Sequence, residues 1–510
     1  MVRKDSRRPA AAGGKPPRQA QSSGARERVF RDKPGSAPSD GPGRRAAKSG
    51  GKAPGPGPGP GARQAGTPRP GPTQVKSLPA VANLTASVAP AVLRAVFDSG
   101  ARLEPAVAQA LRTHPDVRRC DRHLVLRSIA ALCRWWGWIQ PLHLLQVEDQ
   151  LLLATLLDSH EVDGICRAWA GKAGRPFDRL MAVGDAPGWT ARAEGLKRWV
   201  GGGPVTADPW LLFPAWLRDQ LPVPPGDAPA KARRLAFLHA LQTRLPLWVG
   251  VRGAAEKAIW NELREAGLKP WIHRRLTTAA RFDPDTDLTS LRPYREGDLA
   301  IDDLSSQALG KVCDPDPGER WWDVIGGTGL HALHLGALME NKGTVITTFE
   351  HDKRRHETAI RLRRFPFRNI AAKLWDGRRC PGKPGSFDGV LVDAPCSAVG
   401  NWRRHPELRW IVKKEDLPQL VERQKQLLDA ASAAVRPGGT LIYSVATATV
   451  IETLDLITAF LGSHPAFCLD PFPHPLEEST TAGTLQLWPH LHDSEARFIA
   501  RMVRKTSPKE

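Results

Sequence analysis

Paired cysteines and long apolar runs are missing from this chain of 510 residues. Its seven cysteines are scattered, with no Cys-x-x-Cys pair and no Cys/His cluster at zinc spacing. This pattern indicates a reduced, intracellular protein, and no metal site is expected. No segment offers the uninterrupted apolar stretch of a membrane span, and the N-terminus is charged where a signal peptide is apolar. We therefore expect a soluble, cytoplasmic protein.

Large apolar side chains are also scarce in residues 1–80, which are mostly Pro, Gly, Arg, Lys and Ser. This segment contains 17 Lys or Arg and 4 Asp or Glu, so it supplies +13 of the formal net charge of +20. Such a composition cannot bury enough surface to offset its ordering entropy, and it predicts a disordered basic tail. Two interpretations of the tail stay open: a nonspecific RNA-binding arm, or a solubilising extension.

The remaining residues are too many for one hydrophobic core and change their pattern along the chain. Residues 83–235 repeat apolar side chains every three or four positions, which predicts a helical domain. Residues 240–310 mix short strands with a helix and predict a small α+β linking subdomain. Residues 311–510 alternate strands with helices, which predicts an α/β, Rossmann-like, doubly wound domain with a mainly parallel sheet. The tryptophans of residues 134–139 follow helical spacing and favour a core position over base stacking.

Glycines and acidic residues follow the strands of the last region. A glycine-rich turn, Ile325 to His331, comes after the first strand, and missing side chains there let a ligand approach the backbone. Glu350, Asp376 and Asp393 end the second, third and fourth strands. Ligands of such sheets bind at the carboxyl ends of the strands, so three acids in this position favour a nucleotide-type cofactor site.

The segment "DAPCSAVGNWRRHPELRW", Asp393 to Trp410, together with "RQKQLLDAASAAVRPGGTLIYS", closely resembles the RsmB/NOP-type family of S-adenosylmethionine-dependent RNA (cytosine-5) methyltransferases. The resemblance spans about residue 245 to the C-terminus. The region 83–235 more weakly resembles the antitermination-factor-like, RNA-binding domain that precedes many bacterial members. The resemblance implies a monomer that uses S-adenosyl-L-methionine and methylates carbon 5 of a cytosine in RNA, most plausibly ribosomal RNA.

The resemblance also implies roles for individual residues. In the family, the cysteine of Asp-Ala-Pro-Cys assists release of the enzyme from its product. Here that cysteine is Cys396, and catalysis would fall to it and to Asp393, which would neutralise charge on the base. Arg403 and Arg404 would hold RNA phosphates around the target nucleotide. The cofactor would be held by Ile325, Gly326, Gly327, Thr328, Gly329, Leu330, His331, Glu350, Asp376 and Asp393.

The chain departs from the family pattern at several positions. Ala446 stands where the family has its nucleophilic cysteine, His331 replaces a lysine, and "SEARF" replaces Asp-Gly-Phe-Phe near the C-terminus. Three interpretations follow: Cys396 has become the nucleophile; catalysis is lost and an RNA-binding or ribosome-assembly protein remains; or the fold serves a dinucleotide oxidoreductase. The Asp-Ala-Pro-Cys and arginine motifs disfavour the third. A neighbouring carboxylate would raise the pKa of Cys396, whereas Arg403 or His405 would lower it, and the sequence leaves this open.

Overall fold

The computed structural model describes residues 77–506 except 115–116, 118, 145, 159–163, 175–187, 200–207 and 254–255. Residues 72–510 form one compact unit. The predicted disordered tail, residues 1–80, therefore lies outside the described residues except for its last four, three of which begin the first helix.

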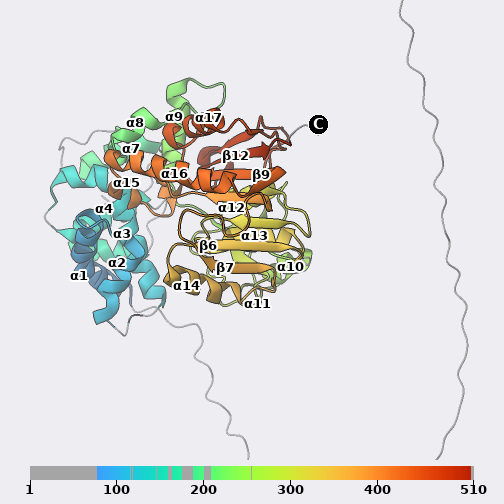
Figure 1. Cartoon of the computed structure of the whole chain (residues 1–510). Helices are drawn as coiled ribbons and strands as arrows, with labels where there is room; N and C mark the ends of the chain where they lie inside the picture. The colour runs from blue at the N-terminus through green and yellow to red at the C-terminus, as the bar shows by residue number, and fades with distance from the viewer. Residues whose placement is uncertain are drawn as a thin grey trace, which may run out of the picture. The chain divides into compact units, whose positions relative to one another are not determined.

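Helices alone make up the first part of the described chain (Figure 1). In α3 the buried side chains Val125, Ile129 and Leu132 recur at the spacing of one helix face. Trp135 and Trp138 are also buried, which confirms the predicted core position of these two tryptophans. The α-helices of this part are α1 (Leu78–Phe97), α2 (Leu103–Ala110), α3 (Arg119–Ile139), α4 (Val147–Asp158), α5 (Gly164–Ala173), α7 (Gly188–Trp199), α8 (Trp216–Gln220) and α9 (Ala230–Gln242).

One of these helices, α1, has the length and apolar composition of a membrane span. About 44% of its most apolar window is buried inside the protein, and Val81, Val88 and Val92 belong to the core of the helical part. The core helix of a globular domain passes the same test, so this helix is weak evidence for a span. The predicted cytoplasmic location and monomeric state stay predictions.

A small antiparallel sheet follows, in the strand order β2-β3-β1-β4. The segment "LPLWVGVRG" contains β1 and "AAEKAIWNELREAGL" contains α10, in line with the short strands and helix predicted for residues 240–310. Gly267, just past that helix, has a φ of +82°, a left-handed conformation typical of a residue that terminates a helix. The elements here are β1 (Leu247–Val251), α10 (Glu256–Glu265), β2 (Trp271–Ile272), β3 (Ala279–Phe282), α11 (Arg292–Glu296), β4 (Leu299–Ile301) and α12 (Leu304–Cys313).

The C-terminal part contains an eight-stranded sheet in the order β10-β12-β9-β8-β5-β6-β7, with β11 paired to β12. Strands β5 to β9 run parallel, and β12 is antiparallel to β9, which confirms the predicted Rossmann-like α/β class. The strands are β5 (Arg320–Asp323), β6 (Thr344–Phe349), β7 (Ile370–Leu374), β8 (Phe387–Asp393), β9 (Val435–Val445), β10 (Phe467–Leu469), β11 (Thr484–Leu487) and β12 (Arg497–Arg504). The helices are α13 (Leu330–Leu338), α14 (Asp352–Leu362), α15 (Leu408–Ile411), α16 (Leu417–Ser432), α17 (Leu454–Ser463) and α18 (Pro489–His492).

Central strands of this sheet are covered on both faces, so their sequences are apolar at successive positions rather than alternating. Val390, Leu391 and Val392 of β8 are all buried. The apolar spacing of residues 417–435 predicts one helix, but the helix found there, α16, is shorter. It ends at Ser432, and Val435 begins β9, where it pairs with Phe387 of β8.

The motif segment after β8 joins the helical part to the sheet. Val399, Trp402, Leu408 and Leu417 belong to the same apolar cluster as the helices. Arg409 is fully buried and donates hydrogen bonds to the carbonyl oxygens of Leu212 (3.2 Å) and Leu241 (3.2 Å). Trp410 donates to the carbonyl of Cys133 (2.7 Å). The helical part and the C-terminal sheet therefore share a core along this segment.

Candidate active site

A pocket of about 840 Å³ opens where β5, β6 and β8 end. Parallel strands bring their carboxyl ends to one edge of a sheet, so loops far apart in sequence meet there. Most of the residues predicted to hold a cofactor line it: Ile325, Gly326, Gly327, Thr328, Leu330, His331, Glu350 and Asp393.

The glycine turn forms one wall of the pocket. Gly327 (φ +50°) and Gly329 (φ +83°) adopt left-handed conformations that other residues rarely take. Helix α14 supports the turn from behind, because Thr358 donates a hydrogen bond to the carbonyl of Gly327 (3.1 Å) and Arg361 donates one to that of Thr328 (2.7 Å). Gly329 does not line the pocket itself; it precedes α13 and leaves room for Thr358, which would lie 2.7 Å from an added Cβ.

The two acids at the next strand ends differ in position. Glu350 lines the pocket, is partly exposed, and has one carboxylate oxygen, Oε1, bonded to Arg423 of α16. Asp376 is outside the lining, and its carboxylate accepts the backbone N–H groups of Arg378 and Arg379 (2.9 Å each). Those two bonds hold the pKa of Asp376 below its usual value. Asp376 thus closes a local turn, which does not fit the predicted contact with a cofactor.

Asp393 lies at the floor of the pocket between two cationic side chains. Arg497 Nη1 is 2.5 Å from one carboxylate oxygen, and His331 Nε2 is 2.9 Å from the other. Burial by itself would raise the pKa of Asp393, but the charges of Arg497 and His331 outweigh it and hold this pKa well below its usual range. Asp393 in turn raises the pKa of His331 against the opposing effect of burial. Asp393 is therefore ionised at neutral pH.

Cys396 is partly buried and lies just beyond the pocket lining. Burial, and next the charge of Glu452, raise the pKa of its thiol; Asp393 adds to this, while the backbone N–H groups of Ala398 and Ala446 act in the opposite direction. Neither cation considered from the sequence is available to lower it: Arg403 is paired with Asp493, and burial lowers the pKa of His405 to about 3, so this ring is neutral. In this state Cys396 is a protonated thiol. Its contact with the Ala446 amide shows that positions 396 and 446 are adjacent.

A buried carboxylate, Glu452, connects the loop after β8 to the loop after β9. It accepts hydrogen bonds from the Ser397 backbone N–H (2.9 Å), the Ser397 hydroxyl, Gln424 (2.9 Å) and the Thr449 hydroxyl (2.6 Å). The Tyr443 hydroxyl donates to its backbone carbonyl (2.9 Å). This network holds Cys396 and Ala446 in a defined relation at the pocket edge.

The two arginines predicted to bind RNA are placed differently. Arg403 is 3% exposed, and its guanidinium bonds to Asp493 (2.8 Å) and to the carbonyl of Arg244 (3.0 Å). Its donors are used inside the protein, so the prediction that Arg403 holds RNA phosphates is corrected to a structural role at the domain junction. Arg404 lines the pocket, is about one-third exposed and pairs with Glu495 (3.0 Å).

Several pocket residues were missed by sequence reasoning. Arg497 is the most important, and its signal was the arginine of "SEARF", which begins β12 where the family pattern has Asp-Gly-Phe-Phe. Asp303 caps α12 by accepting the Ser305 N–H (2.8 Å), and Asp302 pairs with the buried Arg252 (2.5 Å). The loop that carries these two acids forms the opposite wall of the pocket. The sequence does not show that this loop lies near the end of β8, because the two segments come together only in the folded chain.

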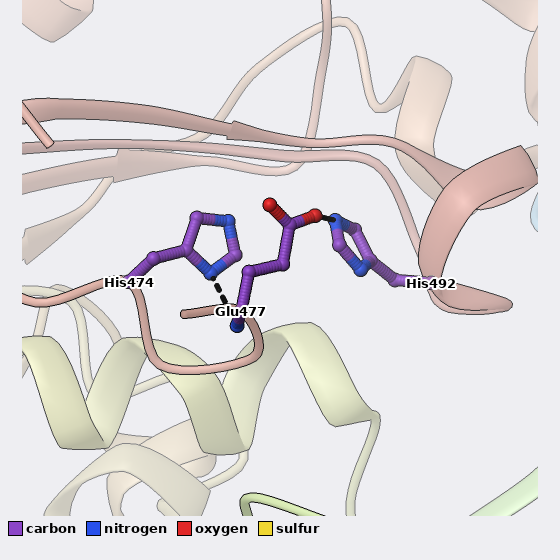
Figure 2. Close-up of side chains that lie close together, drawn as sticks. All are labelled: His474, Glu477 and His492. Atoms are coloured by element: carbon purple, nitrogen blue, oxygen red, sulfur yellow. Dashed lines mark hydrogen bonds and ion pairs between the residues drawn. The ribbon is translucent and has the colours of Figure 1, made fainter. Parts of the chain in front are cut away.

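A separate group, His474, Glu477 and His492, brings potential metal ligands within 4.8 Å of one another. Figure 2 shows the carboxylate of Glu477 between the two rings. Nδ1 of His474 accepts the backbone N–H groups of Leu476 (3.1 Å) and Glu477 (3.0 Å), so the proton of the neutral ring is on Nε2. A nitrogen that carries a proton cannot bind a metal. Burial lowers the pKa of His474 and lowers that of His492 to about 4, so both imidazole rings are neutral at pH 7.

The sheet order, the glycine turn at the end of β5 and the acids after β6 and β8 define a Rossmann-like methyltransferase domain. Residues 311–503 match the family model described as 16S rRNA methyltransferase RsmB/F.

Comparisons with known proteins agree with this assignment. A Mycobacterium tuberculosis protein named as a methyltransferase is 35% identical over 243 residues, which is 46% of this chain and 52% of that protein. Ribosomal RNA small subunit methyltransferase B of Cronobacter sakazakii is 29% identical over 276 residues, 53% of this chain and 62% of that protein. The chain thus spans about half to three-fifths of the length of these curated relatives. The crystal structure of PH0851 has the same fold, with a TM-score of 0.63 and 21% identity over 83% of this chain and 98% of that one.

Proposed function

We propose that this protein binds S-adenosyl-L-methionine in the 840 Å³ pocket and methylates carbon 5 of a cytosine in ribosomal RNA. The observation that carries the proposal is the meeting of the glycine turn, Glu350 and Asp393 at one sheet edge. Glycines at this turn leave the backbone open to the cofactor, and Glu350 is placed to accept hydrogen bonds from ribose hydroxyls. For Glu350 Oε2, no partner is found among the described residues.

The bound cofactor would supply an electrophilic methyl group. Carbon 5 of cytosine is a weak nucleophile until a thiolate adds to carbon 6, and Cys396 is the cysteine at the pocket edge that can add. The N–H groups of Ala398 and Ala446 favour its thiolate form, against burial and Glu452. Once carbon 5 has taken the methyl group, S-adenosylhomocysteine is left. Carbon 5 then loses its proton to water, and departure of the sulfur from carbon 6 as a thiolate restores the aromatic ring and the free cysteine.

Asp393 has a fixed role in this scheme. Because Arg497 and His331 keep it ionised, it can accept a hydrogen bond from the amino group of a flipped cytosine. The same cations make it a poor proton donor. Asp393 would therefore orient the base, and Arg404 at the pocket wall would lie near its phosphate.

A second function is favoured by two observations: the alanine at position 446 and the raised pKa of the Cys396 thiol. In that case the pocket still binds the cofactor and RNA, but no methyl group is transferred. The protein would then act as an RNA-binding or ribosome-assembly factor.

The experiment that separates the two functions measures transfer of labelled methyl from S-adenosylmethionine to ribosomal RNA from cells lacking this protein. We expect transfer by the wild type and at least about 1,000-fold slower transfer by Cys396→Ala, because a methyl side chain cannot form the covalent adduct. Cys380→Ala is the matched control, since Cys380 is partly buried like Cys396 but, unlike Cys396, does not adjoin a residue that lines the pocket. Absence of transfer by the wild type, with cofactor and RNA still bound, would establish the second function.

The cofactor assignment is tested in the same preparations by calorimetric titration. Glu350→Ala should weaken S-adenosylmethionine binding about 10- to 100-fold, since a charged hydrogen-bond acceptor is removed. Glu357→Ala is the control, because Glu357 is an exposed acid of α14 outside the pocket. Equal affinities for both variants would place the cofactor elsewhere.

A further inference from the structure

The net positive charge of residues 81–510 is concentrated in one short segment. Residues 351–383 contain eleven Lys or Arg and three Asp or Glu, a net charge of +8. Residues 1–80 carry +13 of the total of +20, so the rest of residues 81–510 sums to −1. The segment comprises α14, β7 and the loop that leads to β8.

This segment forms an edge of the molecule. Strand β7 is the last strand of the eight-stranded sheet, and Figure 1 shows α14 beside it. The late part of α14 and β7 border a shallow groove of about 370 Å³, whose lining includes Arg363 and Arg368. We call the exposed cations of this edge, apart from Arg361, which bonds to the glycine turn, the α14 surface: Lys353, Arg354, Arg363, Arg368, Lys373, Arg378, Arg379 and Lys383.

No ion pair is found among the described residues for the cations of the α14 surface. Among the described residues, the ion pair found inside the segment joins Arg355 to Asp352 (2.7 Å), and neither belongs to this set. No acidic side chain is found paired with Lys353, Arg363 or Lys373 in the described part of the chain. Uncompensated, exposed cations on one side of a molecule attract a polyanion and steer it toward the surface.

The α14 surface is continuous with the active-site pocket. Arg354 lines the pocket near the start of α14, and Arg361 bonds to the Thr328 carbonyl in the glycine turn. Gly377, between β7 and the Arg378–Arg379 pair, approaches Glu350 so closely that an added Cβ would lie 2.7 Å from its carboxylate. A polyanion seated on these cations would therefore reach the pocket opening.

We propose that the α14 surface binds the phosphate backbone of the substrate RNA beyond the target nucleotide, as a second contact area separate from the pocket. The proposal rests on the proposed function only for the identity of the polyanion. Phosphates are contacted without base specificity, so the surface would add affinity and orient the RNA while the pocket selects the base.

The test compares two triple variants of the full chain that remove the same charge. The first is Lys353→Gln, Arg363→Gln and Lys373→Gln, which leaves Arg354 at the pocket intact. The control is Lys231→Gln, Lys257→Gln and Lys425→Gln, three exposed lysines outside both the pocket and the segment. The probe is unmodified 16S ribosomal RNA made by transcription, and binding is measured over a range of salt concentrations.

We expect the first variant to bind the RNA about 10- to 100-fold more weakly near 0.1 M salt. The slope of log K against log salt should fall by about 2, because each lost phosphate contact contributes about 0.7 to 0.9. In the control variant, the RNA affinity and the salt slope should each change by no more than a small fraction of these amounts. Equal loss in both variants would overturn the proposal, since only overall charge would then matter.

Two further measurements separate this proposal from the proposed function. Cofactor affinity of the first variant should equal that of the wild type, and a loss there would overturn a purely RNA-binding role. If the wild type transfers no methyl group but its RNA binding still depends on the α14 surface, the proposal for this surface stands and the proposed methyl transfer fails. Binding to vesicles of anionic phospholipid that depends on the three cations, with unchanged RNA binding, would assign the surface to a membrane and overturn the proposal.

Discussion

Arg497 determines the charge of the pocket floor. Its guanidinium bonds to Asp393 (2.5 Å) and to the Ser444 hydroxyl (2.7 Å), and it is almost fully buried. A buried cation next to a buried carboxylate stabilises the charged form of both. The pattern "SEARF", a departure from the family's apolar pair, thus creates an ion pair at the position where the substrate base is proposed to bind.

For the buried acid Asp323, no bonded cation is found among the described residues. Burial raises its pKa to about 6; its Oδ2 accepts a bond from Thr347 (2.8 Å), and no partner for Oδ1 is found in the described structure. An acid whose pKa is higher in the folded state than in the unfolded state stabilises the fold at pH values below its unfolded pKa, near 4. That stabilisation is lost as the pH rises through 6.

The residue-scale prediction concerns Asp323→Asn. Because the amide cannot ionise, the stability of the variant relative to the wild type should rise by about 3 kcal/mol between pH 4 and pH 8. Urea unfolding of both proteins at several pH values measures this difference. If the stability difference between variant and wild type stays constant with pH, then the pKa of Asp323 is not raised in the folded protein. Asp316→Asn, at an exposed position, is the control.

At the scale of elements, the loops after β8 and β9 depend on one carboxylate. Glu452 accepts four hydrogen bonds from three residues, and its charge is the second cause, after burial, of the raised pKa of the Cys396 thiol. The same side chain therefore positions Cys396 and suppresses its ionisation.

Replacing Glu452 by Gln should have two separable effects. The amide group cannot accept all four bonds, so the free energy of unfolding should fall by roughly 2–4 kcal/mol. The pKa of Cys396 should also fall, so that alkylation of Cys396 by iodoacetamide becomes faster at a fixed pH near 8. Mass spectrometry of the alkylated peptide measures the rate. Glu415→Gln, at an exposed acid, should change neither quantity, and slower alkylation in Glu452→Gln would contradict the electrostatic role.

At the scale of the molecule, the helical part and the C-terminal sheet depend on each other. Trp402, between β8 and α16, packs against Phe213 and Trp216 of the helical part, with ring centroids 6.1 and 5.9 Å apart. Val399, Leu408 and Leu417 complete this shared core. Exposing four such side chains costs about 1.5–3 kcal/mol each, which together approaches the stability of a typical domain.

The matching prediction uses two truncations. A fragment of residues 243–510 should aggregate or melt well below the full chain, because its apolar surface has lost its cover. A fragment of residues 77–510 keeps that cover and should melt within a few degrees of the full chain. Size-exclusion chromatography and thermal unfolding measure both. A monomeric 243–510 fragment with an unchanged melting temperature would show that the two parts are independent.

The parallel strands, the glycine turn and the position of Glu350 could be predicted from sequence because each depends on local pattern. Apolar runs specify buried strands, and acids directly after such runs must lie at the same edge of the sheet. Cys396 and Asp393 were likewise found from one continuous motif. The predicted cofactor contact of Asp376 does not fit the structure, because its Oδ1 accepts the Arg378 and Arg379 amides of a local turn. The strand pattern alone does not reveal this turn.

The sequence by itself determined the α/β class, the family motif and the excess of basic residues. Only the tertiary structure decided which charges are free and which are paired. The sequence "NWRRHP" gives no sign that Arg403 is buried. In the folded chain, Asp493 and carbonyl oxygens from a distant loop surround it. Arg497 meets Asp393 across more than a hundred residues. Pairing of this kind depends on distances that exist only after the chain has packed, because burial and Coulomb interaction both act through space rather than along the sequence.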